Sequence, residues 1–247
     1  MDRLIHTAMT GMQSSHAKLR MIASNMANAQ TIGFRAEMMN HVPITLKGDG
    51  LEARVMTSGE VVASDLSAGA IIQTGRTLDM ALSGNAMLAV QAQDGSEGYT
   101  RRGDLSVSAS GILTNGDDLP VLGASGVISI PPGLHITIAD DGTLTASDPA
   151  NPDQPPQVFG QLKLVSITPR DVAKGIDGQF RALAGGALPQ DLTARLTSGA
   201  LEQSNVNPTA VLVDMIEAQR LFDMRTKIMS TARDLDQGGA SLMRLNS

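Results

Sequence analysis

The sequence has no cysteine and no tryptophan, and its 247 residues include only one tyrosine and four phenylalanines. The absence of cysteine excludes disulfides, thiolate metal ligands and cysteine nucleophiles. Because binding pockets and nucleic-acid platforms usually draw on aromatic side chains, their scarcity disfavours both kinds of site. Methionine, in contrast, occurs 14 times. It suits either an ordinary core or an apolar surface that repacks against several neighbours.

Net charge and the length of the apolar runs exclude further classes. The formal net charge of −6 disfavours a nucleic-acid-binding protein, which needs a basic footprint. No stretch approaches about 18 consecutive apolar residues, so we expect no transmembrane span. Residues 1–7 lack a basic region followed by an apolar core of about 7 to 15 residues, so we expect no cleavable secretory signal.

A regular apolar spacing predicts a helix over residues 3–28. Apolar or small residues recur there at alternating steps of three and four, the spacing of a packed helical seam. They are Ile5, Ala8, Met12, Ser15, Leu19, Ile22 and Met26. Gly33 follows the pattern, and glycine readily takes the left-handed backbone conformation that stops helices.

The C-terminal residues repeat this spacing and predict a second helix. Its apolar residues at steps of seven are Leu221, Ile228, Leu235 and Leu242, and the intermediate positions are Ala218, Arg225, Ala232 and Gly239. Pro208 suits the first turn of a helix, and Asn207 before it can cap the free N–H groups.

Residues between the two helices alternate between apolar and polar or small, which is typical of half-buried strands. Three such runs are 78–82, 105–109 and 134–138, and one further strand is expected over 158–167. Turn dipeptides separate them at Asp94-Gly95, Asn115-Gly116 and Asp141-Gly142. A proline-dense loop covers 148–157, and 171–200, rich in glycine and alanine, follows no clear period.

Together these patterns predict an α+β fold with paired long N- and C-terminal amphipathic helices, coiled-coil-like in their packing, and a β-rich middle domain. The predicted segments are a helix and turn over 1–36, an extended connector over 37–75, the β-rich domain over 76–170, a returning connector over 171–200 and a helical segment over 201–247. Our hypothesis is that both ends gain order by pairing with each other and with neighbouring chains. The alternative is an ordinary helical hairpin covering the β-rich domain of a monomer.

The sequence shows no convincing catalytic or metal-binding set. Ser15 and Lys18 fit the S-x-x-K pattern of serine acyl-transfer enzymes, but the companion S-D-N and K-T-G elements are absent. Residues 48–53 match a loose dinucleotide fingerprint without the β-α-β context that it requires. The four histidines lack metal-ligand spacing, and the paired aspartates lie beside glycines in turns. We therefore predict a structural protein with no cofactor and no metal, and the alternative is an enzyme with an unrecognised pocket in the β-rich domain.

Three motifs resemble the flagellar rod and hook protein family. Residues 23–35, ASNMANAQTIGFR, are similar to the family's N-terminal NNLAN…T.GF(K/R) signature. Residues 199–207, GALEQSNVN, followed by MIEAQR over 215–220, are similar to its C-terminal G.LE.SNV(N/D)…MI..QR signature. Tyr99-Thr100-Arg101 and the glycines around it resemble the family's β-domain. Two departures stand in that domain: Ala86-Met87-Leu88 replaces the usual GFF aromatics, and Arg102 replaces the aspartate of YTRDG.

The resemblance implies a structural subunit of the bacterial flagellar basal body, polymerising through its terminal helices to transmit torque for motility. Within the family, the sequence most resembles a proximal-rod subunit, and the alternative is a distal-rod or hook-type subunit. It also implies export through the flagellar type III apparatus and assembly in the periplasmic space with copies of itself and related rod proteins, with no nucleic-acid partner.

The same resemblance implies roles for individual residues. Asn25 and Asn28 are expected to cap or cross-link helix backbones near a turn that Gly33 allows and Phe34 packs beneath, and Asn205 and Asn207 do the same before the second helix. The predicted assembly residues are Ile5, Met12, Leu19, Ile22, Asn25, Met26, Asn28, Gly33, Phe34, Asn205, Asn207, Met215, Gln219, Arg220, Leu221, Ile228, Leu235 and Leu242.

Overall fold

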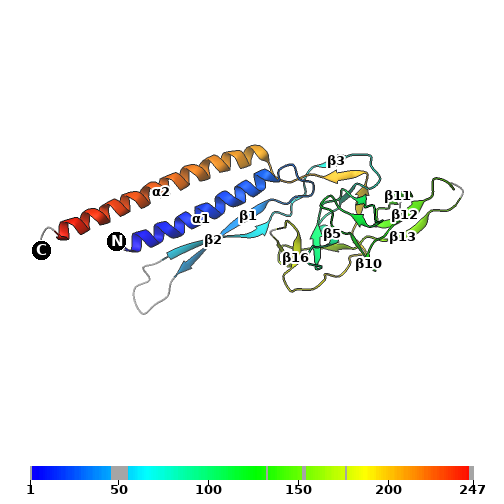
Figure 1. Ribbon diagram of the computed structural model, residues 1–247, viewed down its shortest axis with the longest axis horizontal. Helices are drawn as coiled ribbons and strands as arrows, with labels where there is room; N and C mark the ends of the chain where they lie inside the picture. Colours follow the sequence, from blue (N-terminus) through cyan, green and yellow to red (C-terminus); the bar gives the residue numbers. More distant parts are fainter. Residues whose placement is uncertain (1, 46–54, 132, 152–153, 176, 245–247) are drawn as a thin grey trace. The chain divides into compact units, whose positions relative to one another are not determined.

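A computed structural model describes residues 2–45, 55–131, 133–151, 154–175 and 177–244 (Figure 1). The chain divides into two compact units. The first, here called the helical unit, comprises Met1–Ala27, Glu37–Ala63 and Asn207–Ser247. The second, the β-rich unit, comprises Asn28–Ala36 and Ser64–Val206. Each unit therefore takes segments from distant parts of the sequence.

The helical unit contains one helix from each end of the chain. Helix α1 spans Asp2–Ala27 and helix α2 spans Pro208–Arg244. Asn207 caps α2 as predicted, since its Oδ1 accepts hydrogen bonds from the N–H groups of Thr209 at 3.0 Å and Ala210 at 3.2 Å. Strands β1 (Glu37–Thr45) and β2 (Val55–Ser64) form a two-stranded sheet within the segment predicted as an extended connector. Neither helix, over the residues described, combines the length and apolarity needed to cross a bilayer.

The predicted fold class is wrong in its account of the two ends. The described chain has two helices, one N-terminal and one C-terminal, and a β-rich body; it does not have the paired, coiled-coil-like helical ends that we predicted. The large apolar residues predicted to form the seam of α2 are exposed: Leu221 is 38 %, Ile228 49 % and Leu235 63 % accessible. Residues this accessible do not interlock in a shared apolar seam.

The shielded side of α2 includes the predicted intermediate positions Ala218, Arg225 and Ala232, but it has Phe222 and Met229 where the prediction had Leu221 and Ile228. Its buried and half-buried residues recur at steps of four and three and are Val211, Met215, Ala218, Phe222, Arg225, Met229 and Ala232. Arg225 donates hydrogen bonds to the carbonyl oxygen of Gly11 and to Ser15 Oγ, and Phe222 meets His16 edge-on at 6.5 Å between ring centroids. The prediction was wrong for Leu221, Ile228 and Leu235 because the shielded face alternates steps of four and three through Phe222 and Met229.

The β-rich unit is built from short strands. They are β3 (Ile71–Gln73), β4 (Met80–Leu82), β5 (Ala86–Gln91), β6 (Glu97–Thr100), β7 (Ser106–Val107), β8 (Leu113–Thr114), β9 (Leu122–Gly123), β10 (Gly126–Val127), β11 (His135–Ile138), β12 (Thr143–Ser147), β13 (Gln157–Gln161), β14 (Leu164–Ser166), β15 (Val172–Lys174), β16 (Phe180–Ala182), β17 (Leu196–Ser198) and β18 (Ala200–Glu202). The largest sheet has the order β14-β5-β6-β16-β15, and a second has the order β11-β12-β13. Two small antiparallel pairs, β17-β4 and β18-β3, bring residues 196–202 back to strands that lie early in the sequence.

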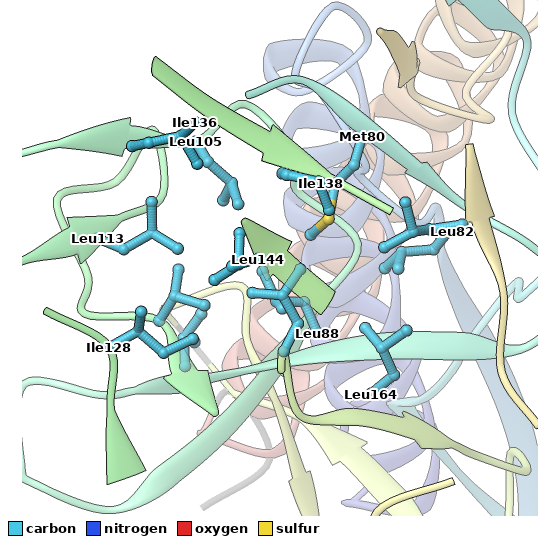
Figure 2. Packing of buried hydrophobic residues seen from close by; sticks show 14 of the residues in the cluster. Met80, Leu82, Leu88, Leu105, Leu113, Ile128, Ile136, Ile138, Leu144 and Leu164 are labelled. Atoms are coloured by element: carbon cyan, nitrogen blue, oxygen red, sulfur yellow. The ribbon is translucent and has the colours of Figure 1, made fainter. Parts of the chain in front are cut away.

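Strand β5 is buried on both faces and lies between two apolar clusters. Leu88 and Val90 pack in the larger cluster, which Figure 2 shows around Leu144 and Leu164. The alternate residues Met87 and Ala89 pack in the smaller cluster with Tyr99. Because successive side chains of a strand point to opposite faces, a run of five buried residues places β5 at the centre of the unit.

The strand predictions were partly right. The run over 134–138 corresponds to β11, whose exposed and buried residues alternate. The strand expected over 158–167 is instead two strands in different sheets, β13 and β14. The segment 171–200, predicted as a connector, contains β15, β16 and β17. The turn glycines Gly95 and Gly142 have φ of 81° and 82°, as their turns require.

Tyr99 is inaccessible to solvent, and its phenolic oxygen accepts a hydrogen bond from the N–H of Leu188 at 2.6 Å. Burial raises the pKa of Tyr99 to about 12. The unfolded chain loses the same proton near pH 10, so the native state binds more protons between about pH 10 and 12 and loses stability as the pH rises through that window.

We expect the absorbance of tyrosinate to rise with a midpoint near pH 12 in the native protein and near pH 10 in denaturant. Tyr99 is the sole tyrosine, so the signal has no other source. A native midpoint near pH 10 would show that the ring is not buried.

Candidate functional site

Three charged side chains from distant parts of the sequence meet inside the β-rich unit. The side chains of Arg35, Glu202 and Arg101 are 0 %, 1 % and 3 % accessible. Glu202 Oε1 lies 2.7 Å from Arg35 Nη2, and Glu202 Oε2 accepts a hydrogen bond from Arg101 Nε at 2.6 Å. One carboxylate thus serves two buried guanidinium groups, which leaves a net charge of +1. We call these three residues the charge cluster.

Backbone groups satisfy much of the remaining polarity of Arg101. Its Nη1 donates to the carbonyl oxygens of Gly84 at 2.7 Å and Ala86 at 2.8 Å, and its Nη2 donates to the carbonyl of Leu82. Burial lowers the pKa of Arg101; the Glu202 carboxylate opposes this shift, and the like charge of Arg35 adds to it. Because arginine keeps its proton in proteins, the side chain remains a cation that depends on these partners.

Arg35 and Glu202 also bind the segment between β2 and β3. Arg35 Nη1 donates to the carbonyl oxygen of Ser67 at 2.6 Å, and Glu202 Oε1 accepts from the N–H of Gly69 at 2.8 Å. Arg35 Nε has no hydrogen-bond partner among the described residues, and its Nη2 contact with Glu202 is an ion pair without hydrogen-bond geometry. Arg35 is therefore held mainly by one carboxylate and one carbonyl.

The turn before Arg35 packs against the same cluster through its backbone. Gly33 has φ of 68° and donates its N–H to the carbonyl oxygen of Glu202 at 2.8 Å. A Cβ at Gly33 would lie 2.4 Å from the carbonyl carbon of Arg101, which leaves no room for a side chain. Phe34 lies beneath Lys174, whose Nζ is 3.5 Å from the ring centroid and donates to the carbonyl oxygen of Arg35 at 2.9 Å.

Asn205 links two loop backbones beside the cluster. Its Oδ1 accepts from the N–H of Ala36 at 2.7 Å, and its Nδ2 donates to the carbonyl oxygens of Asp65 at 2.9 Å and Ser67 at 3.0 Å. One amide side chain thereby ties the backbone at Ala36 to the backbone at residues 65–67, which lie far from each other and from Asn205 in sequence. This is the cross-linking expected of Asn205, although the backbones that it joins are not helical.

The other predicted asparagines have local roles. In the helical unit, Asn25 exchanges two hydrogen bonds with the backbone of Glu37, donating from Nδ2 at 3.0 Å and accepting at Oδ1 at 2.8 Å. It therefore joins α1 to strand β1 instead of to another helix backbone. In the β-rich unit, Asn28 Oδ1 accepts from Thr31 Oγ1 at 3.1 Å and supports the turn.

A cavity of about 330 Å³ in the β-rich unit offers no catalytic arrangement. It is lined by Gln93, Asp94, Asp117, Leu119, Asp177, Gln179 and Arg181. Its charged groups pair with their neighbours, as in the ion pair of Arg181 and Asp177 at 2.7 Å. Across the described residues, no three histidine, cysteine or acidic side chains are grouped so that they could hold a metal ion.

Three stretches of the chain match known families. Residues 5–35 match the flagella basal body rod protein family, residues 81–146 the flagellar hook protein FlgE/F/G D1 domain, and residues 197–242 the flagellar basal body rod FlgEFG protein C-terminal region. The flagellar basal-body rod protein FlgF of Escherichia coli K12 is 41 % identical over 95 % of both chains, and that of Salmonella typhimurium LT2 is 38 % identical over 98 % of both. The chain belongs to the flagellar basal-body rod protein family.

Each matched stretch of this rod protein supplies one residue of the charge cluster. Arg35 comes from the N-terminal match, Arg101 from the D1 match and Glu202 from the C-terminal match. FlgG of Bacillus subtilis is also similar, at 30 % identity over 99 % of this chain and 100 % of its own. The chain is thus a structural subunit of the flagellar rod and not an enzyme.

The predicted assembly residues do not form a single site. Gly33, Phe34 and Asn205 surround the charge cluster. On the helices, Ile22 is buried, whereas Met12, Leu19 and Met215 are half-buried and Met26, Gln219 and Arg220 are exposed with Leu221, Ile228 and Leu235. Ile5 and Leu242 lie in α1 and α2, but their side chains fall outside the described residues.

The β-rich unit accommodates both departures from the family motifs. Ala86, Met87 and Leu88 are all buried in β5, so aliphatic side chains fill the positions of the lost aromatics. Arg102 pairs with Asp104 at 2.8 Å and with Asp117 at 2.5 Å, so the substituted arginine joins a local ion-pair network near the surface.

The three cluster residues lie within the family motifs, but no sequence pattern singles them out as site residues. Arg35 and Glu202 are the sole charged residues of ASNMANAQTIGFR and GALEQSNVN, whereas Arg101 is followed by a second arginine, Arg102. The signal that could have indicated a charge cluster is the occurrence of opposite charges in separate motifs of one family. The sequence does not show that these side chains are buried or that they lie together.

Proposed function

We propose that this rod subunit assembles through an exposed apolar stripe on α2. The stripe comprises Val213, Leu221, Met224, Ile228 and Leu235, which are 38 to 63 % accessible. At about 100° per residue, these positions lie on one side of the helix, next to the shielded side that includes Ala218 and Arg225. Glu217 interrupts the stripe between Val213 and Leu221, and from Leu221 to Leu235 its members are apolar. An apolar stripe exposed to water is typical of a surface that a protein partner covers.

The partners that we propose for the stripe are copies of this chain and related rod proteins, held together as a shaft that transmits torque. The apolar chemistry of the stripe supports a helical or apolar neighbour. Membership of the rod family supports self-assembly with rod and hook proteins.

We further propose a place in the proximal rod, reached across the periplasm through the flagellar type III export apparatus without a cleaved signal. Higher identity to FlgF than to FlgG supports the proximal position. The full-length similarity to FlgG of Bacillus subtilis keeps a distal-rod position as the second candidate. Membership of the rod family supports the location and the export route.

Deleting the gene from the source bacterium tests the function as a whole. We expect cells without swimming motility and basal bodies without a complete rod, both restored by the intact gene. Normal swimming of the deletion strain would reject the rod function. Truncated rods that still contain the proximal segment would favour the distal position.

A further inference from the structure

The charge cluster receives its only carboxylate from a late part of the sequence. Arg101 precedes Glu202 by 101 residues, and Arg35 comes earlier still. A chain is synthesised from its N-terminus, so both guanidinium groups exist long before their shared partner. Until then, closing the β-rich unit would bury two like charges side by side without compensation.

The same late segment completes other parts of the unit. Strand β17 pairs with β4, and β18 pairs with β3. The carbonyl oxygen of Glu202 also accepts the N–H of Gly33. A single segment therefore supplies the carboxylate, two strand partners and a turn contact.

We propose that the charge cluster is a folding latch, which makes closure of the whole β-rich unit conditional on the carboxylate of Glu202. Arg35 and Arg101 hold the unit open while they lack a counter-charge. Binding of β18 brings the carboxylate between them and removes that obstacle. The unit then closes in one cooperative step, with the Arg101 side chain bonded to the carbonyls of Leu82 at the end of β4, Gly84, and Ala86 at the start of β5. This inference stands independently of rod assembly.

Amide hydrogen exchange of the full-length chain tests the latch with Glu202→Gln. This change keeps the shape of the side chain and raises the buried charge from +1 to +2. We expect protection to fall about a hundredfold or more in β5, β6 and β14, at the centre of the largest sheet. Asp177→Asn is the matched control, because its ion pair with Arg181 is exposed at 39 % and 33 % and should change protection little.

The double variant Arg35→Met with Glu202→Gln separates charge from shape. It returns the buried charge to +1 and leaves the bonds of Arg101 to backbone carbonyls in place. We expect it to recover most of the protection that Glu202→Gln loses. The latch is rejected if the double variant stays as unprotected as Glu202→Gln, because charge is then not the cause. It is also rejected if Glu202→Gln affects only β3, β18 and residues 28–36 while β5, β6 and β14 stay protected.

Discussion

Ile228→Asp is expected to abolish incorporation of the subunit into the rod without unfolding the chain. Ile228 is 49 % accessible, so a polar side chain there should change the stability of the free subunit by no more than about 0.5 kcal/mol. In an assembled contact, the change would remove about half of the roughly 1.5 to 3 kcal/mol that full burial of such a side chain contributes, and it would add the larger cost of burying a charge. Each contact should therefore weaken roughly a hundredfold. Motility of a complemented deletion strain and the subunit content of its purified basal bodies measure the effect.

Ser230→Asp is the control for this prediction. Ser230 is exposed on the same helix, two residues further along and outside the apolar stripe, so the same charge should leave assembly intact. Ile22→Asp would be a poor substitute, because Ile22 is 2 % accessible and aspartate there should destabilise the free subunit. Normal rods from Ile228→Asp, or equal defects from both aspartates, would contradict assembly through the stripe.

Gly33→Ala, in the turn before Arg35, is expected to cause a large loss of stability. Alanine at φ of 68° costs about 1 to 2 kcal/mol by itself. The new Cβ would also lie 2.4 Å from the carbonyl carbon of Arg101, and backbone atoms cannot yield as a flexible side chain can. Overpacking of this kind should add about 1 to 3 kcal/mol. Urea unfolding followed by the fluorescence of Tyr99, in a chain without tryptophan, measures the total.

Gly75→Ala separates the two contributions. Gly75 has φ of 72°, but a Cβ added there would meet no atom within 4 Å beyond its chain neighbours, so only the backbone strain applies. We expect Gly33→Ala to unfold at a clearly lower urea concentration than Gly75→Ala. Equal midpoints would mean that the turn does not pack against Arg101.

The start of α2 could be predicted because it depends on local chemistry. Asn207 and Pro208 form a cap that any helix can use, and the cap is present. The shielded face could not be predicted from the same residues. The predicted intermediate positions Ala218 and Arg225 do lie on the shielded face. The predicted heptad positions Leu221 and Ile228 do not, because the shielded face continues through Phe222 and Met229, one residue further along.

In the β-rich unit, too, local features could be predicted from the sequence and long-range ones could not. Turns at Gly95 and Gly142 followed from dipeptides, since their left-handed conformation is a property of one residue. The separation of residues 158–167 into β13 and β14 depends on pairing with β12 and β5, which no local pattern encodes. The charge cluster could not be predicted from local sequence, because its members come from three distant segments and their interaction depends on their burial.

Thiol labelling of the apolar stripe in purified basal bodies tests rod assembly through α2 most directly. The natural chain has no cysteine, so Ile228→Cys and Ser230→Cys each introduce one unique thiol. Both should react readily with a maleimide in the free subunit, where both side chains are exposed. In assembled rods, we predict that Ile228→Cys is protected and that Ser230→Cys reacts more readily. Equal reactivity of Ile228→Cys in rods and in free subunits would contradict the proposal that a neighbouring subunit covers the stripe.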